Sequence, residues 1–135
     1  MTMTITYLAD SSIWIDYLRR KISPLQPFIA ANTAGHSEPV SMELLARAHT
    51  PETRREIERL LLRSPLMQFD SASDFMSASD LRRSALRRRL RVSIVDCMII
   101  AVAGRHDAPL LTLDRGQAAL AQAHGVRATL LPSPD

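Results

Sequence analysis

The sequence predicts an α/β protein, a three-layer α/β/α sandwich in which a mainly parallel sheet of five strands lies between helices. Short apolar runs alternate with longer stretches in which apolar residues recur every three or four positions, and these are the patterns of strands and of amphipathic helices. The 135 residues contain no repeat, low-complexity tract or change of composition, so a single domain, 1–135, is expected. Strands separated by helices pair in parallel, because each helix returns the chain to the same end of the sheet.

The expected elements follow one another in a regular order. The apolar runs expected as strands are 5–9, 37–40, 66–69, 109–113 and 126–131. Helices are expected at 12–20, within 22–36, from Ser41, from Thr50, over 72–90, from Ser93 to about His106, and over 116–124. Capping residues place several of these ends, because Thr50-Pro51 opens a helix, Ser93 caps another, and Gly125 closes the last.

The charge of the chain is mildly basic and is carried almost entirely by arginine. Seventeen Lys and Arg residues face fourteen Asp and Glu residues, which gives a net charge of +3, and only Lys21 is a lysine. Arginine binds phosphate in a planar, bidentate geometry. Nucleic acid is therefore a reasonable partner, and ordinary surface charge is the alternative.

Composition also excludes several classes of protein. The single cysteine, Cys97, excludes an internal disulfide and a cysteine-based zinc cluster, and we expect it in the core. The first ten residues lack the basic and long apolar stretches of a signal peptide. The longest apolar stretch, Ile94 to Ala103, is interrupted by Asp96 and is too short for a membrane span. We expect a cytoplasmic protein that has no contact with a membrane.

Two aspartates stand where apolar runs end. Asp10 follows the run 5–9, Asp114 follows the run 109–113, and a small or polar turn comes after each. Parallel strands end at the same edge of a sheet, which is where open α/β sheets bind ligands. Each aspartate alone is more typical of a turn or a helix cap, but the pair predicts a site at this edge.

Two further acids are expected at helix starts near that edge. Asp96 is the only charged residue in its apolar stretch, so its carboxylate lies close to the core, where an unpaired charge is costly. A capping box with Ser93 explains Asp96 equally well. Glu43 lies in the first turn of the helix from Ser41, where an acid also favours the helix dipole. Glu38 is expected on the surface, towards the opposite end of the sheet.

Asp10, Glu43, Asp96 and Asp114 together form a candidate catalytic site. Four carboxylates brought together repel one another unless a cation lies between them, and oxygen ligands favour the hard ions Mg²⁺ and Mn²⁺. Such an ion lowers the pKa of a bound water and stabilises charge that develops on phosphate. The four acids therefore predict metal-assisted hydrolysis of a phosphodiester.

The sequence resembles PIN-domain ribonucleases, and most closely the VapC-type toxins of type II toxin–antitoxin systems. The segments that carry the resemblance are LADSSIWIDYL, PVSMELLAR and SIVDCMIIAVAGRHDAPLLTLDRG. The resemblance implies a sheet of order 3-2-1-4-5, endoribonuclease activity, and one or two Mg²⁺ or Mn²⁺ ions held by Asp10, Glu43, Asp96 and Asp114. It also implies a supporting hydrogen bond from Ser12, a homodimer, a cognate VapB-type antitoxin, and a structured RNA substrate such as tRNA or rRNA.

One position departs from the pattern of these toxins. They often carry a further acid and an aromatic residue after the last aspartate, at the positions where this chain has Gly116 and Gln117. A second metal that depends on the further acid would lack that ligand here.

Arginines crowd the end of the long helix expected over 72–90. If the helix persists, Arg83, Arg87 and Arg91 share one face at a spacing of four residues, where like charges destabilise a helix. RNA phosphate would offset that repulsion, and a solvated or internally paired face, with Asp74 and Asp80 as partners, is the alternative. The candidate RNA-binding residues are Arg83, Arg87, Arg88, Arg91 and Arg115.

Other functions remain open at this point. One is a non-catalytic PIN module that binds RNA or antitoxin, and another is a housekeeping PIN nuclease without an antitoxin. A phosphotransferase or phosphatase with Asp10 as nucleophile is disfavoured, because Ser12 stands where those enzymes usually carry a second aspartate. The four histidines are scattered, and none pairs with another at the spacing of a metal site.

Overall fold

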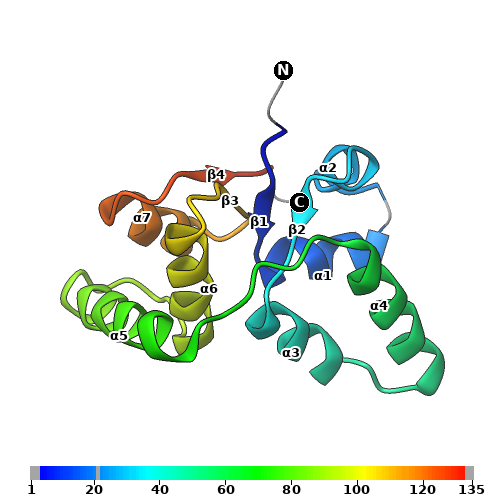
Figure 1. The fold of residues 1–135 in the computed structure, drawn as a ribbon, viewed down its shortest axis with the longest axis horizontal. Coiled ribbons are helices and arrows are strands. Elements are labelled where there is room, and N and C mark those ends of the chain that lie inside the picture. The colour runs from blue at the N-terminus through cyan, green and yellow to red at the C-terminus, as the bar shows by residue number, and fades with distance from the viewer. Residues whose placement is uncertain (1–3, 21, 133–135) are drawn as a thin grey trace.

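The computed structural model describes residues 4–20 and 22–132. At least one helix separates each strand from the next along the chain (Figure 1). Their bounds are β1 Tyr7–Ala9, α1 Ser11–Arg20, α2 Gln26–Ala30, β2 Ala34–Gly35, α3 Glu38–Ala46, α4 Pro51–Arg63, α5 Ser71–Arg87, α6 Ile94–Arg105, β3 Leu110–Thr112, α7 Arg115–Ala123 and β4 Ala128–Leu130. None of the helices in the described part of the chain is long and apolar enough to cross a membrane.

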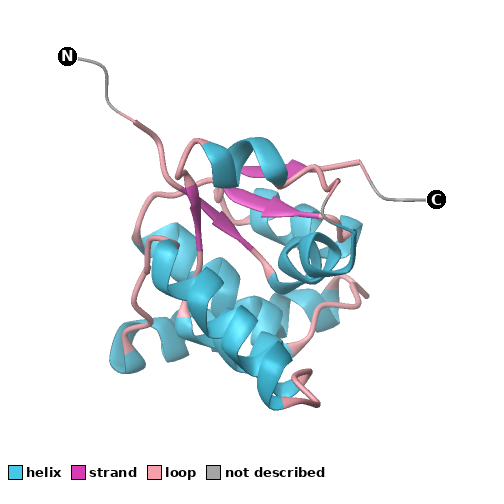
Figure 2. Ribbon diagram, turned by 90° about the vertical axis from the view of Figure 1, so that its right-hand side faces the viewer, coloured by secondary structure: helices cyan, strands magenta, loops and turns pink. Residues whose placement is uncertain are grey.

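The four strands form one parallel sheet of order β2-β1-β3-β4. An isolated parallel bridge between His36 and Leu66 places one more segment beyond β2, where the order 3-2-1-4-5 requires the third strand. The predicted fold class is therefore confirmed. Of the five expected strands, the one at 66–69 is reduced to this bridge. The strands are short, and most of the residues belong to the helices that pack against them (Figure 2).

The strand expected at 37–40 and the helix start expected at Ser41 were wrong. The second strand lies earlier, at Ala34–Gly35, and α3 begins at Glu38, with Ser37 in the N-cap position. A serine followed two residues later by a proline is a common helix start, because proline fits the first turn. This shift places Glu43 in the second turn of α3 instead of the first, and leaves Glu38 exposed beside Phe69, whose backbone N–H it accepts at 2.9 Å.

Helices lie on both sides of the sheet. In Figure 1, α5, α6 and α7 lie together to the left of β1, whereas α1 to α4 lie together on the right. Side chains from the strands and from both sets of helices form one core, in which Leu8, Trp14, Ile99 and Leu111 are fully buried or nearly so. Cys97 is also buried, as predicted.

Helix α5 ends earlier than the sequence pattern indicates. Its last helical residue is Arg87, and Arg89 adopts a left-handed conformation with φ of 56°, while the N–H of Leu90 returns to the carbonyl of Ala85 at 2.9 Å. This is a Schellman arrangement, which terminates a helix. The expectation that Arg83, Arg87 and Arg91 share one helix face was therefore wrong, because Arg91 lies beyond the end of the helix.

A buried ion pair joins α5 to α6. The guanidinium of Arg105 donates to both carboxylate oxygens of Asp74, with two distances of 3.0 Å, and Asp74 is 1% exposed. Asp74 is thus not available to neutralise the arginines near the other end of α5. Phe75, the next residue, is half exposed and packs edge-on against Phe69.

Candidate metal centre

Asp10 and Asp114 leave neighbouring strands at the same edge of the sheet. Strand β1 ends at Ala9 and its partner β3 ends at Thr112. The backbone N–H of Asp10 donates to the carbonyl of Leu111 at 3.0 Å, which fixes the start of one turn against the end of the other strand. The parallel pairing of β1 and β3 therefore places both acids at the carboxyl edge, where the sequence predicted them.

The carboxylate of Asp10 is buried and fully engaged by hydrogen bonds. Its side chain is 1% exposed. Oδ1 accepts from the Ser12 hydroxyl at 2.6 Å and from the Ile13 backbone N–H at 3.1 Å, and Oδ2 accepts from the Thr112 hydroxyl. The bond from Ile13 caps α1, and the role of Asp10 as a site acid stays a prediction. The two explanations that its sequence position offered are compatible.

Ser12 links the two strand ends. Its hydroxyl donates to Asp10 and accepts the backbone N–H of Leu113 at 3.1 Å. The single hydroxyl therefore fixes the carboxylate that follows β1 to the backbone that follows β3. This geometry is the support that the resemblance implied for Ser12, and its functional importance stays a prediction.

Asp96 lies in the first turn of α6, where Ser93 caps the helix and accepts the N–H of Asp96 at 3.0 Å. Burial is the main cause that raises the pKa of Asp96, and the negative charges of Glu43 and Asp114 raise it further against the hydrogen bonding of Ser93. The carboxylate of Asp96 therefore lies within the electrostatic field of two other predicted acids.

The same field reaches Asp10. Burial raises the pKa of Asp10 to about 6, hydrogen bonds from Ser12, Thr112 and Ile13 oppose the rise, and the charge of Asp96 adds to it. Asp96 is thus the acid whose charge couples to each of the other three, Asp10, Glu43 and Asp114. The charge of Asp96 acts on Asp10, and the charges of Glu43 and Asp114 act on Asp96. We call these four acids the acidic cluster, and their joint role as a metal site stays a prediction.

Glu43 and Asp114 complete the cluster from two further helices. Glu43, half-buried on α3, accepts a hydrogen bond from the Ser11 hydroxyl at the start of α1. Asp114 caps α7 by accepting the Gln117 N–H at 2.9 Å. Asp114 is therefore oriented by a backbone donor in the first turn of α7. Glu43 is held by a side-chain hydroxyl from the first turn of α1.

The donor set suits a hard divalent cation. All four side chains offer carboxylate oxygens, and burial together with mutual repulsion raises the pKa of Asp10 and Asp96, a repulsion that a cation would relieve. Within residues 4–20 and 22–132, no three His, Cys, Asp or Glu side chains already stand as a ready-made ion cage. Binding of an ion would therefore require some of these carboxylates to turn towards it.

Gly116, which stands where related toxins often carry a further acid, lies next to the carboxylate of Asp114. A Cβ built on Gly116 would lie 3.2 Å from Asp114 Oδ1 and 3.4 Å from the carbonyl oxygen of Arg91. The glycine therefore sits directly against the carboxylate of Asp114, and its lack of a side chain leaves that face of Asp114 open.

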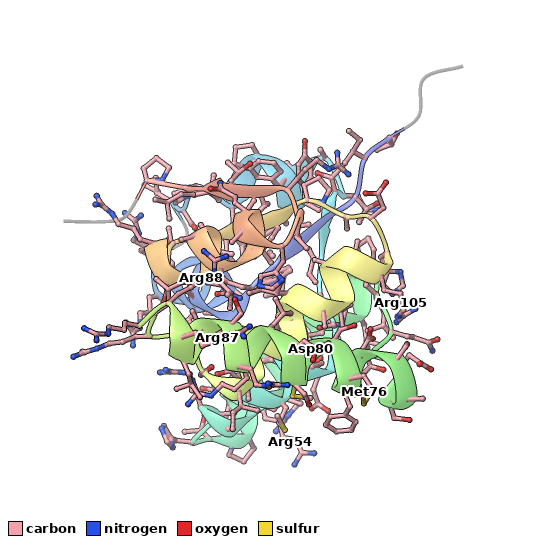
Figure 3. The ribbon with its side chains drawn as sticks, turned by 90° about the vertical axis from the view of Figure 1, so that its left-hand side faces the viewer. Arg54, Met76, Asp80, Arg87, Arg88 and Arg105 are labelled. Carbon is pink, nitrogen blue, oxygen red and sulfur yellow. The ribbon has the colours of Figure 1, made fainter. Side chains whose placement is uncertain are left out.

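The predicted RNA-binding arginines differ in how near the structure places them to Asp114. Arg83, Arg87, Arg88, Arg91 and Arg115 are all exposed. Arg115 is the first residue of α7, directly after Asp114, and the backbone of Arg91 packs against Gly116. Figure 3 shows Arg87 and Arg88 at one end of α5, where Arg88 Nε also donates to Ser84 Oγ at 3.1 Å.

Three polar residues at this edge were not predicted from the sequence. Ser11 holds Glu43, Thr112 holds Asp10, and the buried side chain of Gln117 lies against Thr112. Thr112 and Gln117 left weak signals, since a threonine interrupts the apolar run 109–113 and Asp114-x-x-Gln117 has capping-box spacing. Nothing local in the sequence indicates that Ser11 reaches Glu43, which lies on another helix.

Comparison with known proteins agrees with this geometry. The family model described as the PIN domain matches residues 7–123. The chain belongs to the PIN-domain family. This PIN domain is 36% identical, over 115 residues, to VapC ribonuclease Mb1587 of Mycobacterium bovis and to ribonuclease VapC11 of Mycobacterium tuberculosis, with 79% of this chain and 85% of each relative covered. It therefore lies among the VapC relatives within the family.

Solved structures share the fold at lower identity. DNA-bound VapBC from Salmonella typhimurium matches with a TM-score of 0.78 at 20% identity, over 93% of this chain and 98% of the other. VapBC-1 from nontypeable Haemophilus influenzae matches with a TM-score of 0.74 at 14% identity, over 93% and 97% of the two chains. These likenesses confirm the PIN fold.

Proposed function

We propose that this PIN domain is a Mg²⁺- or Mn²⁺-dependent endoribonuclease, the toxin of a toxin–antitoxin system. The observation that carries the proposal is the placement of Asp10 and Asp114 just after the paired strands β1 and β3, at the same edge of the sheet. The effect of the charge of Asp96 on Asp10, and of the charges of Glu43 and Asp114 on Asp96, supports a common site. Two relatives at 36% identity are named ribonucleases, which supports RNA as the substrate class.

The residues of the site have distinct roles in this proposal. Asp10, Asp96, Asp114 and Glu43 hold the metal, and Ser12 and Thr112 keep the carboxylate of Asp10 in one orientation. A bound divalent ion supplies a water of lowered pKa and neutralises charge on the reacting phosphate. The acids supply no covalent nucleophile, because water attacks the phosphodiester.

RNA reaches the site across an arginine-rich surface made of Arg83, Arg87, Arg88, Arg91 and Arg115. Arg115 directly follows Asp114, and the backbone of Arg91 lies against Gly116. In the proposal, these two arginines bind phosphates next to the reacting bond. Arg87 and Arg88 extend the positive charge along α5 (Figure 3). Structured RNA such as tRNA or an rRNA loop is the proposed substrate, because arginines contact both phosphates and unstacked bases.

Two protein partners complete the proposal. Solved neighbours of the fold are named VapBC toxin–antitoxin complexes, and on that ground we assign this chain a VapB-type antitoxin. A homodimer follows from the same resemblance. Co-expression with the product of a short gene that directly precedes this one, followed by measurement of the mass of the purified complex, tests both partners. Absence of such a gene, or a product that does not co-purify, contradicts the assigned antitoxin.

Two acids of α3 allow a matched test of the metal site. Glu43 belongs to the acidic cluster, whereas Glu38 is exposed and, among the described residues, accepts one hydrogen bond, from the backbone N–H of Phe69. Mn²⁺ binding by calorimetry and Mg²⁺-dependent cleavage of total tRNA and rRNA are measured for wild type, Glu43→Gln, Glu38→Gln, Asp10→Asn and Asp96→Asn. We expect Glu38→Gln to retain both properties. The other three variants lose cleavage, and their affinity for Mn²⁺ falls by about tenfold or more. Equal cleavage by all five proteins overturns the site.

Gly116 favours a second candidate function, a non-catalytic module that binds RNA or antitoxin. The glycine stands against Asp114 where related toxins often carry a further acid. The same calorimetry separates the two functions, because a module binds RNA but no Mn²⁺. A wild-type chain that binds Mn²⁺ and cuts RNA rejects the module.

A further inference from the structure

The side chain of Gln117 is buried beneath the acidic cluster with an unused donor. Gln117 is 1% exposed, and its Oε1 lies 3.4 Å from the hydroxyl oxygen of Thr112. Among the described residues, its Nε2 has no hydrogen-bond partner. A buried amide donor without a partner is costly. We therefore expect an acceptor among the groups that surround the Gln117 amide.

The hydrogen bonds of Thr112 leave room for one donor. Its hydroxyl has one hydrogen and two lone pairs. The hydrogen is given to Asp10 Oδ2, and one lone pair accepts the backbone N–H of Asp114 at 2.9 Å. The hydroxyl therefore cannot also donate to Gln117, but its second lone pair can accept from it.

A half-turn of the Gln117 carboxamide satisfies these requirements. The two ends of a carboxamide have almost the same shape, and the hydrogen-bond network decides which end carries the nitrogen. With the ends exchanged, Nε2 takes the place beside Thr112 Oγ1, and the oxygen takes the place that has no partner. This orientation gives the buried donor an acceptor and fills every site on the Thr112 hydroxyl.

We infer that Gln117 is a positioning residue of the metal site, and this inference rests on the function proposed above. Its amide donates to Thr112, and with both lone pairs of Thr112 occupied the hydroxyl hydrogen has one direction left, towards Asp10 Oδ2. Oδ1 of the same carboxylate is held by Ser12 and by the N–H of Ile13. The chain Gln117–Thr112–Asp10 thus fixes the plane of the carboxylate that faces the metal.

The local sequence allows Gln117 to take this role. The spacing Asp114-x-x-Gln117 is that of a capping box, in which the Gln side chain returns to the backbone N–H of the capping residue. Here that N–H already donates to Thr112, and Asp114 accepts the backbone N–H of Gln117. The Gln117 side chain is therefore released from capping and turns inward under Asp10.

The test measures Mn²⁺ affinity by calorimetry on the full chain for Gln117→Met in three backgrounds, namely wild type, Thr112→Ser and Thr112→Val. Methionine keeps the length and volume of glutamine but has no donor, serine keeps the hydroxyl, and valine removes it. Outer hydrogen-bond partners of metal ligands typically change affinity by about tenfold or more. For this more remote residue we expect a loss of about three- to tenfold in the wild-type and Thr112→Ser backgrounds, and no loss in the Thr112→Val background.

The outcomes separate positioning from packing. A similar loss in all three backgrounds means that Gln117 only fills space, and no loss in the wild-type background means that it does not act on the site. Either result overturns the inference about Gln117. The proposed function still stands in both cases, provided that the wild-type chain binds Mn²⁺. A wild-type chain that binds no Mn²⁺ overturns the proposed metal site itself.

A second measurement does not depend on metal or on folding of the Gln117 variant. The side-chain amide protons of Gln117, followed by NMR in the metal-free protein, exchange slowly with water in wild type and Thr112→Ser, and faster with a shifted resonance in Thr112→Val. Identical amide signals in the three proteins overturn the inference.

Discussion

The carboxyl group of Asp10, at the end of β1, lies within the electrostatic field of Asp96, in the first turn of α6. Burial and this field together raise the pKa of Asp10 to about 6. The folded state therefore binds a proton that the unfolded chain releases near 3.8, so the contribution of Asp10 to stability is complete below about pH 4 and is lost as the pH rises through 6. The difference corresponds to at most about 3 kcal/mol.

Asp10→Asn is expected to stabilise the metal-free protein at pH 7. Asparagine has no charge to bury, but its amide cannot accept the bonds of Ser12 and Thr112 equally well, so we expect a gain of about 1–2 kcal/mol in the free energy of unfolding. Urea unfolding in the presence of a chelator measures the gain, which disappears at pH 4, where Asp10 is protonated in the folded state. The same gain at both pH values would contradict the electrostatic cause.

The site acids could be predicted because each is marked by its local sequence. Asp10 and Asp114 end apolar runs, and Asp96 interrupts a helix that is otherwise apolar. The order of the strands and the position of Thr112 beside Asp10 were not accessible in this way, because 102 residues separate the two side chains. Such contacts depend on how the strands pair, and the chain carries no local signal for that beyond the family resemblance.

Errors in the predicted elements came from segments in which two local signals compete. Residues 37–40 contain a valine and look extended, but Ser37 and Pro39 together begin α3. The long arginine-rich helix was extended too far because arginine favours helices, whereas its end is set by the left-handed Arg89 and by the bond from Leu90 to Ala85. Helix ends determined by backbone conformation leave little trace in composition.

Charge reversal on α5 is expected to weaken RNA binding without unfolding the protein. Arg87→Glu with Arg88→Glu replaces two positive charges with two negative charges at the end of α5 (Figure 3), so the slope of log affinity against log salt becomes shallower by about 1 to 2. The measurement is RNA binding across a salt series in an Asp96→Asn background, which prevents cleavage. Arg54→Glu with Arg55→Glu on α4 makes the same change of charge on the far side of the molecule and is the control. Equal effects of the two pairs would show that only the net charge matters.

The ion pair between Asp74 and Arg105 is expected to stabilise the packing of α5 on α6. Arg105→Ala leaves the carboxylate of Asp74 buried at 1% exposure with the N–H of Asp70, at 2.7 Å, as its remaining donor. We expect a loss of about 3 kcal/mol in the free energy of unfolding, because an uncompensated buried charge remains. Arg54→Ala is the control, since Arg54 and Glu58 form an exposed pair at 3.6 Å that contributes about 0.5 kcal/mol or less. Similar losses for the two variants in chemical denaturation would refute the difference between them.

Arg89 is expected to be a position where glycine stabilises the protein. Its φ of 56° places a side chain in the left-handed region, which costs an L-residue other than glycine about 1 kcal/mol, so Arg89→Gly is expected to raise the free energy of unfolding by up to about that amount. Arg89→Ala keeps the Cβ while it removes the charge, and should give no such gain. Asn32, with φ of 58°, is a second comparison, because asparagine tolerates this conformation better and Asn32→Gly should gain less. If alanine stabilises the chain as much as glycine at position 89, repulsion among the neighbouring arginines, and not backbone strain, is the cause.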